Sequence, residues 1–176
     1  MDERIARIIG VDPGSRITGF GIIDARGGQA CHVHSGSIRL LGASLTERLG
    51  EIFRSISELV AEYRPDEMAI ERVFMARNAA SALKLGQARG AAICGAVRAS
   101  LSVAEYSPRE IKQAVVGKGG ATKEQVQHMV KVLLNLHVGL RSDQADALAV
   151  ALCHCHVRET LRRIPAAEGV QAGRLQ

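Results

Sequence analysis

Residues 8–15 read IIGVDPGS, an apolar run that ends on a carboxylate. The β-branched content of residues 4–11 predicts a buried strand, and Pro13 with Gly14 predicts a turn directly after it. Asp12 therefore stands at the end of a strand, where the chain leaves the sheet. An acidic side chain in that place either begins the turn or takes part in chemistry at the edge of the sheet.

The rest of the pattern predicts an α/β fold built outward from that strand. Residues 18–25 and 31–40 continue the strand pattern as a hairpin meander, and residues 45–64 follow the 3.6-residue period of a helix. The short apolar run at 68–70 suits a strand parallel to the first, because a helical crossover separates the two. Further elements are expected as a helix at 79–101, a strand at 102–106, and helices capped by Ser107, Thr122 and Ser142. The predicted fold class is α/β, with a five-stranded mixed sheet flanked by helices.

Size and composition limit the domain organisation. A chain of 176 residues with 47% apolar content can bury one core, so we expect one domain over residues 1–163. Residues 164–176 have too little apolar surface to be ordered on their own. No apolar run approaches the roughly 18 residues of a membrane span, and the N-terminus does not have the pattern of a signal peptide. These features predict a cytoplasmic protein with no membrane partner, whose four cysteines are reduced.

One run, CHCH at residues 153–156, raises the possibility of a zinc site. Structural zinc sites usually join two ligand pairs across a loop, whereas these four residues alternate around one predicted helix. We therefore expect this run to form ordinary helix surface and core.

Positive charge is concentrated in one part of the chain. The net charge is +5, and residues 77–131 alone hold nine Lys or Arg and three Glu. A cationic half with an acidic site elsewhere suits a polyanion that lies on one face and is processed at a separate point. Charge alone is equally compatible with a solvated basic surface.

Four carboxylates are placed to meet at one edge of the predicted sheet. Asp12 ends the first strand, and Glu71 ends the parallel fourth strand. Asp143 and Asp146 are three residues apart at the start of the last helix, so they share one face. Carboxylates so close together raise one another's pKa unless a cation compensates, and oxygen ligands suit Mg²⁺ or Mn²⁺. Two such ions about 4 Å apart would activate a water and stabilise the leaving oxygen of a phosphodiester, which is nuclease chemistry.

Each acid also has a purely structural interpretation. Asp12 could initiate the Asp-Pro-Gly turn, and Glu71 could pair with a neighbouring arginine. Asp143 and Asp146 could complement the dipole of the last helix. The joint arrangement of the four, rather than any one of them, favours a metal site.

The predicted helix at 79–101 contains Gly86, Gly90 and Gly95. Each glycine costs about 1 kcal/mol relative to alanine inside a helix, so close packing of another backbone is the expected reason for them. The partner is either the sheet or a second copy of the chain.

Four longer motifs surround these residues. They are GVDPGSRITGFGIID around Asp12, AIERVFMARNAASALKLGQARGA around Glu71, KQAVVGKGGATKEQVQHMV in the basic segment, and SDQADALAVALCHCH around Asp143 and Asp146. In order and spacing they resemble the RuvC family of crossover junction endodeoxyribonucleases, bacterial Holliday junction resolvases with an RNase H-like fold. The resemblance runs from about residue 5 to residue 157, with no departure at the acidic positions.

The resemblance implies an enzyme of DNA recombination and repair. It implies a homodimer that binds four-way junction DNA and makes symmetric nicks in two strands of like polarity. Asp12, Glu71, Asp143 and Asp146 match the family's metal-binding catalytic acids, and the expected cofactor is Mg²⁺, replaceable by Mn²⁺, with two ions per active site. Cooperation with the RuvA and RuvB branch-migration complex is also implied.

Further residues match functional positions of the family. Lys112 and Lys123 match basic residues near the scissile phosphate, where a fixed positive charge can stabilise developing negative charge. Phe74 matches an aromatic that stacks on an unpaired base near the crossover, a contact of about 1 to 3 kcal/mol. The ordinary alternatives are backbone-phosphate contact or solvent exposure for the lysines and core packing for Phe74. The other candidates for DNA contact are Arg77, Lys84 and Lys118.

Two other functions share some of these features. A strand ending in Asp-x-Gly also opens the actin-like ATPases and sugar kinases, but these need two such domains. The phosphate-binding loop pattern is missing as well, since Gly117 and Lys118 are followed by Gly119 rather than by Ser or Thr. A junction-binding protein without catalysis would leave the four acids with a structural role, and metal-dependent nicking of a synthetic junction separates this alternative from the nuclease.

Overall fold

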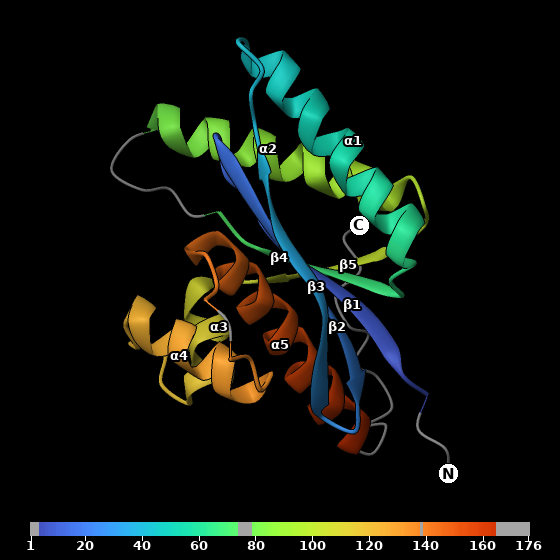
Figure 1. Ribbon diagram of the computed structural model, residues 1–176, viewed down its shortest axis with the longest axis vertical. Helices are drawn as coiled ribbons and strands as arrows, with labels where there is room; N and C mark the ends of the chain where they lie inside the picture. Colours follow the sequence, from blue (N-terminus) through green and yellow to red (C-terminus); the bar gives the residue numbers. More distant parts are fainter. Residues whose placement is uncertain (1–3, 74–78, 138, 165–176) are drawn as a thin grey trace.

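The computed structural model describes residues 4–73, 79–137 and 139–164. Five strands form one mixed sheet in the order β3-β2-β1-β4-β5. The strands are β1 Ala6–Asp12, β2 Ile17–Arg26, β3 Gln29–Arg39, β4 Glu67–Glu71 and β5 Ser102–Tyr106. The helices, shown with the strands in Figure 1, are α1 Leu45–Tyr63, α2 Ala79–Val97, α3 Pro108–Val116, α4 Lys123–Leu133 and α5 Ser142–Arg163. None of the helices within the described ranges is both long and apolar enough to span a membrane.

The strand directions agree with the prediction. β1, β2 and β3 are antiparallel neighbours, and β4 runs parallel to β1 with Ile70 opposite Val11. β5 continues the parallel half, with Tyr106 opposite Glu71. Because β1 and β4 run the same way, Asp12 and Glu71 emerge at the same end of the sheet.

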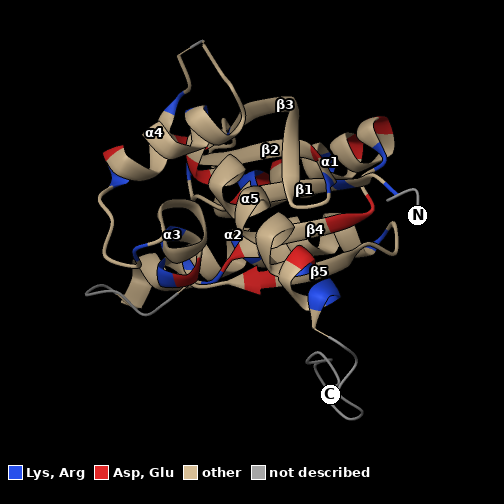
Figure 2. Ribbon diagram, turned by 90° about the horizontal axis from the view of Figure 1, so that it is seen from below, with Lys and Arg blue, Asp and Glu red and all other residues tan. Residues whose placement is uncertain are grey.

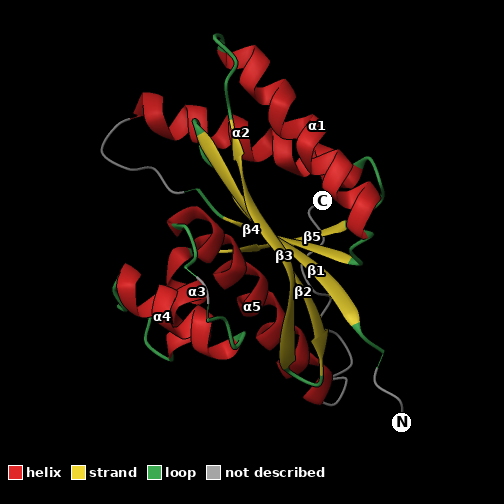
Figure 3. Cartoon of the chain, in the orientation of Figure 1, coloured by secondary structure: helices red, strands yellow, loops and turns green. Residues whose placement is uncertain are grey.

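Helices cover both faces of the sheet (Figure 3). α1 and α2 lie together on one face, and α5 lies on the other with α3 and α4 packed against it. Apolar side chains of β1 alternate between the two cores, since Ile9 and Val11 pack on the α1 side and Ile8 packs on the α5 side. The same alternation places Asp12 on the face that α5 covers.

The last helix approaches the central strands closely at two glycines. A Cβ atom on Gly10 would clash with the carbonyl oxygen of Ala147 and would lie 2.7 Å from the amide nitrogen of Ala151. A Cβ atom on Gly19 would clash in the same way with the backbone of Asp143. Glycine at these positions therefore lets α5 lie directly on β1 and β2, which fixes its N-terminal end relative to Asp12.

The three glycines of α2 do not have one common partner. A Cβ atom on Gly95 would lie 3.0 Å from the carbonyl oxygen of Phe53 and 3.1 Å from Cβ of Ile56. Close backbone packing is thus confirmed at Gly95, but the partner is α1 rather than the sheet. Gly86 and Gly90 have no described atom within 4 Å of an added Cβ, so their side of α2 is open.

Two helix boundaries differ from the prediction. α2 ends at Val97 rather than at residue 101, because a turn follows in which Ser100 adopts a φ of 61°. Ser142 is the first residue of α5, and Arg141 takes the N-cap position that was predicted for Ser142. The Ser142 hydroxyl instead accepts a hydrogen bond of 3.2 Å from the side-chain amide of Gln127 on α4.

Candidate active site

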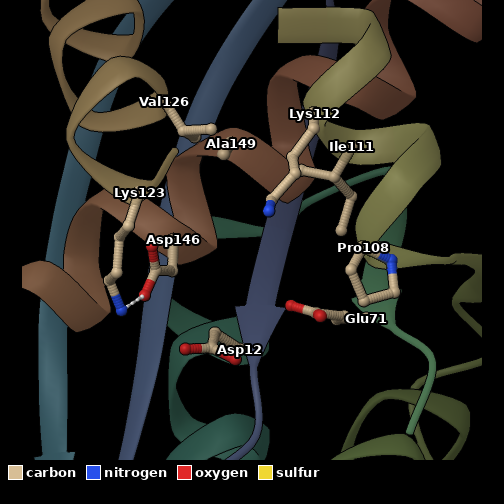
Figure 4. A pocket seen from close by; sticks show the side chains of 9 residues that line it. All are labelled: Asp12, Glu71, Pro108, Ile111, Lys112, Lys123, Val126, Asp146 and Ala149. Atoms are coloured by element: carbon tan, nitrogen blue, oxygen red, sulfur yellow. Dashed lines mark hydrogen bonds and ion pairs between the residues drawn. The ribbon is translucent and has the colours of Figure 1, made fainter. Parts of the chain in front are cut away.

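Three of the four predicted acids line one cavity. Asp12 ends β1, Glu71 ends β4, and Asp146 lies in the first turns of α5. Their carboxylates face a cavity of about 360 Å³, which we call the acid cavity (Figure 4). Lys112 from α3 and Lys123 from the start of α4 also line it. The remaining wall consists of Pro108, Ile111, Val126 and Ala149.

The carboxylates of the acid cavity disfavour one another's charge. Burial and, after it, the charges of Glu71 and Asp146 raise the pKa of Asp12 to about 7, against an opposing effect of Lys123. Burial and the charge of Asp146 also raise the pKa of Glu71. A cation among these carboxylates would favour their ionised forms. Binding of a cation would therefore lower the electrostatic repulsion in the site.

Lys123 supplies part of that positive charge. Its Nζ atom lies 2.5 Å from Oδ2 of Asp146, and this hydrogen bond is the main cause of the raised pKa of Lys123. The charges of Lys123 and Lys112 both lower the pKa of Glu71, against the stronger effect of burial. With 56% of its side chain exposed, Lys123 remains accessible to an anion in the cavity.

Asp143 is placed differently from the other three acids. It lies at the start of α5 but does not line the acid cavity. Its carboxylate accepts a hydrogen bond from the hydroxyl of Ser37 on β3 and lies 3.6 Å from Nε of Arg141. Its charge still contributes to the raised pKa of Asp12. Sequence reasoning missed Ser37, because no pattern in the sequence shows which residues of β3 face α5.

The donor set fits a hard divalent cation, although the side chains are not arranged around one. Carboxylate oxygens are the ligands that Mg²⁺ and Mn²⁺ prefer. Within the described ranges, no three Asp, Glu, His or Cys side chains are grouped closely enough to hold an ion as they lie. Lys123 holds Asp146, and Ser37 holds Asp143. The predicted convergence of four acids therefore requires these two carboxylates to turn toward Asp12.

A buried polar network connects α5 to the parallel strands. The hydroxyl of Tyr106 lies 2.7 Å from Nδ1 of His154, and Nε2 of His154 lies 2.6 Å from Oε2 of Glu67. Arg158 completes the network by donating a hydrogen bond of 2.9 Å to Oε1 of Glu67. Burial raises the pKa of Tyr106, and the hydrogen bond with His154 lowers the pKa of Glu67.

Tyr106 links this network to the end of β4, where Glu71 lies. The carbonyl oxygen of Tyr106 accepts a hydrogen bond of 2.8 Å from the amide of Arg72, the residue after Glu71. His154 belongs to the same helix as Asp146. The network therefore joins the helix that carries one catalytic candidate to the strand end that positions another.

The side chains of the CHCH run enter separate contacts. His154 belongs to the polar network, whereas Nδ1 of His156 lies 3.0 Å from the carbonyl oxygen of Ala114. Cys153 and Cys155 are both buried, and burial raises the pKa of each thiol. The run forms helix core and surface, as its spacing predicted.

The remaining candidates for DNA contact lie partly outside the described residues. Phe74 and Arg77 are outside them. Lys84 is exposed on α2, and Lys118 is exposed between α3 and α4. Figure 2 colours lysine and arginine positions blue, some of them around α3 and α4. Neither of these lysines lines the acid cavity. Arg89, which belongs to the same basic segment, forms an ion pair with Glu105 on β5 and so adds less free positive charge than the sequence suggests.

Known protein sequences resemble this chain over nearly its full length. The family model described as "Crossover junction endodeoxyribonuclease RuvC" matches residues 8–154. A protein of that name from Tolumonas auensis is 55% identical over 170 residues, which cover 96% of this chain and 98% of the relative. Another from Shewanella sp. (strain MR-4) is 59% identical over 157 residues, which cover 89% of this chain and 91% of the relative.

Solved structures resemble the fold as well. Thermus thermophilus RuvC matches with a TM-score of 0.80 at 34% identity, covering 88% of this chain and 96% of the other. A structure of T. thermophilus RuvC in complex with a Holliday junction substrate matches with a TM-score of 0.83 at the same identity and coverage. The yeast mitochondrial Holliday junction resolvase Ydc2 has a TM-score of 0.68 at 13% identity, which supports the fold alone.

Proposed function

The chain belongs to the RuvC family of crossover junction endodeoxyribonucleases, and we propose that Asp12, Glu71, Asp143 and Asp146 are its catalytic, metal-binding acids. Its function is that of a Holliday junction resolvase in DNA recombination and repair. One observation carries the site assignment. Carboxylates from three elements distant in sequence share the acid cavity, where burial and mutual repulsion raise the pKa of Asp12 to about 7.

The cofactor that this donor set fits is Mg²⁺, with Mn²⁺ as a substitute, and we infer two ions per active site. Such ions supply an activated water and stabilisation of the leaving oxygen. Asp12 would be the central ligand of such ions, because the charges of Glu71, Asp146 and Asp143 all act on it. Lys112 and Lys123 face the same cavity and stabilise negative charge that develops on the phosphate.

Removing divalent cations should abolish cleavage and lower the stability of the protein. In EDTA, a synthetic four-way junction should stay intact, and adding Mg²⁺ or Mn²⁺ should restore paired nicks. A saturating cation should also raise the melting temperature, because a ligand at about 100 times its dissociation constant adds about 2.7 kcal/mol to the free energy of unfolding. Cleavage in EDTA, or a melting temperature that does not respond to Mg²⁺, would contradict the metal site.

Neutralising the two cavity lysines should depress catalysis more than folding. Lys112→Gln and Lys123→Gln should each lower kcat by roughly 10²-fold, because each removes a charge aimed at the reacting phosphate. The melting temperature should change less than kcat, since the side chain of Lys123 is 56% exposed and ion pairs near the surface contribute only about 0 to 1 kcal/mol. Lys131→Gln, at the other end of α4, is the matched control. If melting temperature and kcat fall together, the lysines are structural.

The open side of α2 supports the proposed homodimer. Leu83 is 67% exposed there and Val97 is 54% exposed. Gly86 and Gly90 lie between them with no described atom near an added Cβ. Small residues flanked by exposed apolar side chains allow a second backbone to approach closely, which offsets the cost of glycine in a helix. Two copies joined in this way would present two acid cavities to the two strands of a junction.

A charge on this side of α2 should separate the two copies. Leu83→Glu should sediment as a monomer at concentrations where the wild type is a dimer, and should lose paired nicking. Because Leu83 is largely exposed, the variant should still fold. Leu161→Glu, which charges a 59% exposed leucine near the end of α5, should remain dimeric. A dimeric Leu83→Glu variant would place the interface elsewhere.

Other parts of the functional prediction rest on the family. They are symmetric nicks in strands of like polarity, cooperation with the RuvA and RuvB complex, a cytoplasmic location, and one nuclease domain over residues 1–163. Phe74 is proposed to stack on a base near the crossover. Arg77, Lys84 and Lys118 are proposed to contact the DNA backbone.

A further inference from the structure

Besides the two lysines of the acid cavity, further positive charge lies on the β3 side of the catalytic acids. The hydroxyl of Ser37 bonds to Asp143, so Ser37 lies on the face of β3 that meets α5. Residues two apart on a strand share a face, so Arg39 lies on that same face, closer to the end of β3. Arg39 is exposed, whereas Lys112 and Lys123 reach the acids from α3 and α4. The acids therefore lie between positive charges from two different parts of the fold.

Arg16 lies beside Arg39 because the turn after Asp12 is bonded to the end of β3. The amide of Leu40 donates a hydrogen bond of 3.0 Å to the carbonyl oxygen of Arg16. In the sheet, Arg39 pairs with Ile17, the residue that follows Arg16. Figure 1 shows this end of β3 running to the start of α1. Arg16 and Arg39 are both exposed at this one end of the sheet, and we call the two together the arginine edge.

Hydrogen bonds from two side chains hold the turn that carries Arg16. The fully buried side chain of Thr18 bonds both the amide and the carbonyl oxygen of Gly14, each at 3.3 Å. Arg48 on α1 donates from Nη1 to the carbonyl oxygen of Ser15, also at 3.3 Å. A turn held from both sides keeps Arg16 in place relative to Asp12, which begins the same turn.

The two guanidinium groups of the arginine edge are not neutralised within the chain. Over the described ranges, no carboxylate lies within ion-pair distance of Arg16 or Arg39. Arg7, which lies on β1 beside the same strands, shows the contrast, because it pairs with Asp24 at 2.7 Å. An exposed, unpaired guanidinium presents a planar fork of donors that matches a phosphate.

We propose that the arginine edge binds backbone phosphates of the DNA on the β3 side of the catalytic acids. The inference rests on the proposed function and adds a contact region to it. The substrate strand crosses the acids between the arginine edge and the two cavity lysines. Phosphate contacts on both sides of the reacting group fix the direction and register of the strand without reading its sequence.

Salt-dependent binding tests this proposal. A fluorescent synthetic four-way junction is titrated with wild type and with the Arg16→Gln/Arg39→Gln variant in EDTA, between about 50 and 200 mM NaCl. Each lost phosphate contact lowers the slope of log K against log salt by about 0.9, so the double variant should lose about 1.8. At about 0.1 M salt its affinity should be roughly 10- to 60-fold weaker.

Two matched variants separate a charge contact from a change of fold. Arg16→Lys/Arg39→Lys keeps both charges and should keep the wild-type slope. Arg162→Gln removes an exposed charge near the far end of α5 and should leave slope and affinity unchanged. A glutamine double variant with the wild-type slope overturns the arginine edge alone. A lysine variant whose slope falls as far as that of the glutamine variant does so too, because it keeps both charges. A wild-type chain that does not bind the junction overturns the proposed function and this inference with it.

Discussion

Asp12→Asn should abolish junction cleavage, leave junction binding in place and make the metal-free protein more stable. Asparagine keeps the shape of the side chain but removes the charge that attracts a divalent cation. Cleavage in Mg²⁺ should fall by at least about 10²–10³-fold, the loss that follows removal of one electrostatic group at a reacting centre. Binding, measured by gel shift, should persist because phosphate contacts with the basic residues supply it.

The gain in stability follows from the raised pKa of Asp12. A carboxyl whose pKa is about 7 in the folded protein, against an ordinary value of 3.8 in an unfolded chain, destabilises the fold when it is ionised. The destabilisation is absent below about pH 4, grows as the pH rises and is complete above about pH 7. At about pH 8 in EDTA, Asp12→Asn should therefore add about 2 to 4 kcal/mol to the free energy of unfolding. The difference should shrink when both proteins are melted at about pH 5.

A neutral substitution elsewhere controls for the loss of a negative charge. Glu58→Gln on the exposed side of α1 should change neither cleavage nor the pH dependence of the melting temperature. Mg²⁺ should stabilise wild type and Glu58→Gln but not Asp12→Asn. Retained cleavage by Asp12→Asn would refute the assignment of Asp12. If Asp12→Asn melts at the wild-type temperature in EDTA at alkaline pH, the ionised Asp12 carboxylate does not destabilise the fold.

Gly10→Ala should destabilise the whole protein by about 3 kcal/mol or more. The added methyl group would meet the backbone of α5 at Ala147 and Ala151, and backbone atoms cannot rotate away as a side chain can. Inserting a group into a packed core usually costs about 1 to 3 kcal/mol, and a clash between backbones lies at the upper end. Urea unfolding followed by circular dichroism measures the change as a lower midpoint.

Two other glycines give graded comparisons. Gly21→Ala would meet mainly the buried side chain of Leu148, with the Cα atom of Leu148 at 3.0 Å, so its cost should be smaller than that of Gly10→Ala. Gly120→Ala has no described atom within 4 Å of the new carbon and should be close to neutral. If Gly10→Ala unfolds at the same urea concentration as Gly120→Ala, α5 does not need the close approach.

Local patterns in the sequence were sufficient to predict most of the fold. Apolar periods in the sequence placed all five strands, and the helical period of residues 45–64 placed α1. In the structure, the start of α1 is capped by Ser44 and Glu47. The end of α2 was predicted too late because Ser100 takes a positive φ without a glycine to signal it. The N-cap of α5 was placed one residue late because the Ser142 hydroxyl bonds to another helix, and a sequence does not show such a choice.

The candidate site could be predicted only as far as it depends on strand ends and helix spacing. Asp12, Glu71 and Asp146 meet because parallel strands end together and α5 begins over them. The partner of Asp143 could not be predicted, since Ser37 reaches it only through the register of β3. The contact of Tyr106 with His154 likewise depends on which side of α5 meets β5. Such contacts join residues far apart in the chain, and no local pattern encodes them.

The contact of α5 with Gly10 also determines how the arrangement of the acids is lost on unfolding. A helix that lies on the backbone of the central strand cannot open locally, because the same atoms form the middle of the core. The acids at its start should therefore share the slowest hydrogen-exchange unit of the molecule and not a fraying end. The position of the α5 acids and the global fold would then be lost in one cooperative step, and not by local opening of α5.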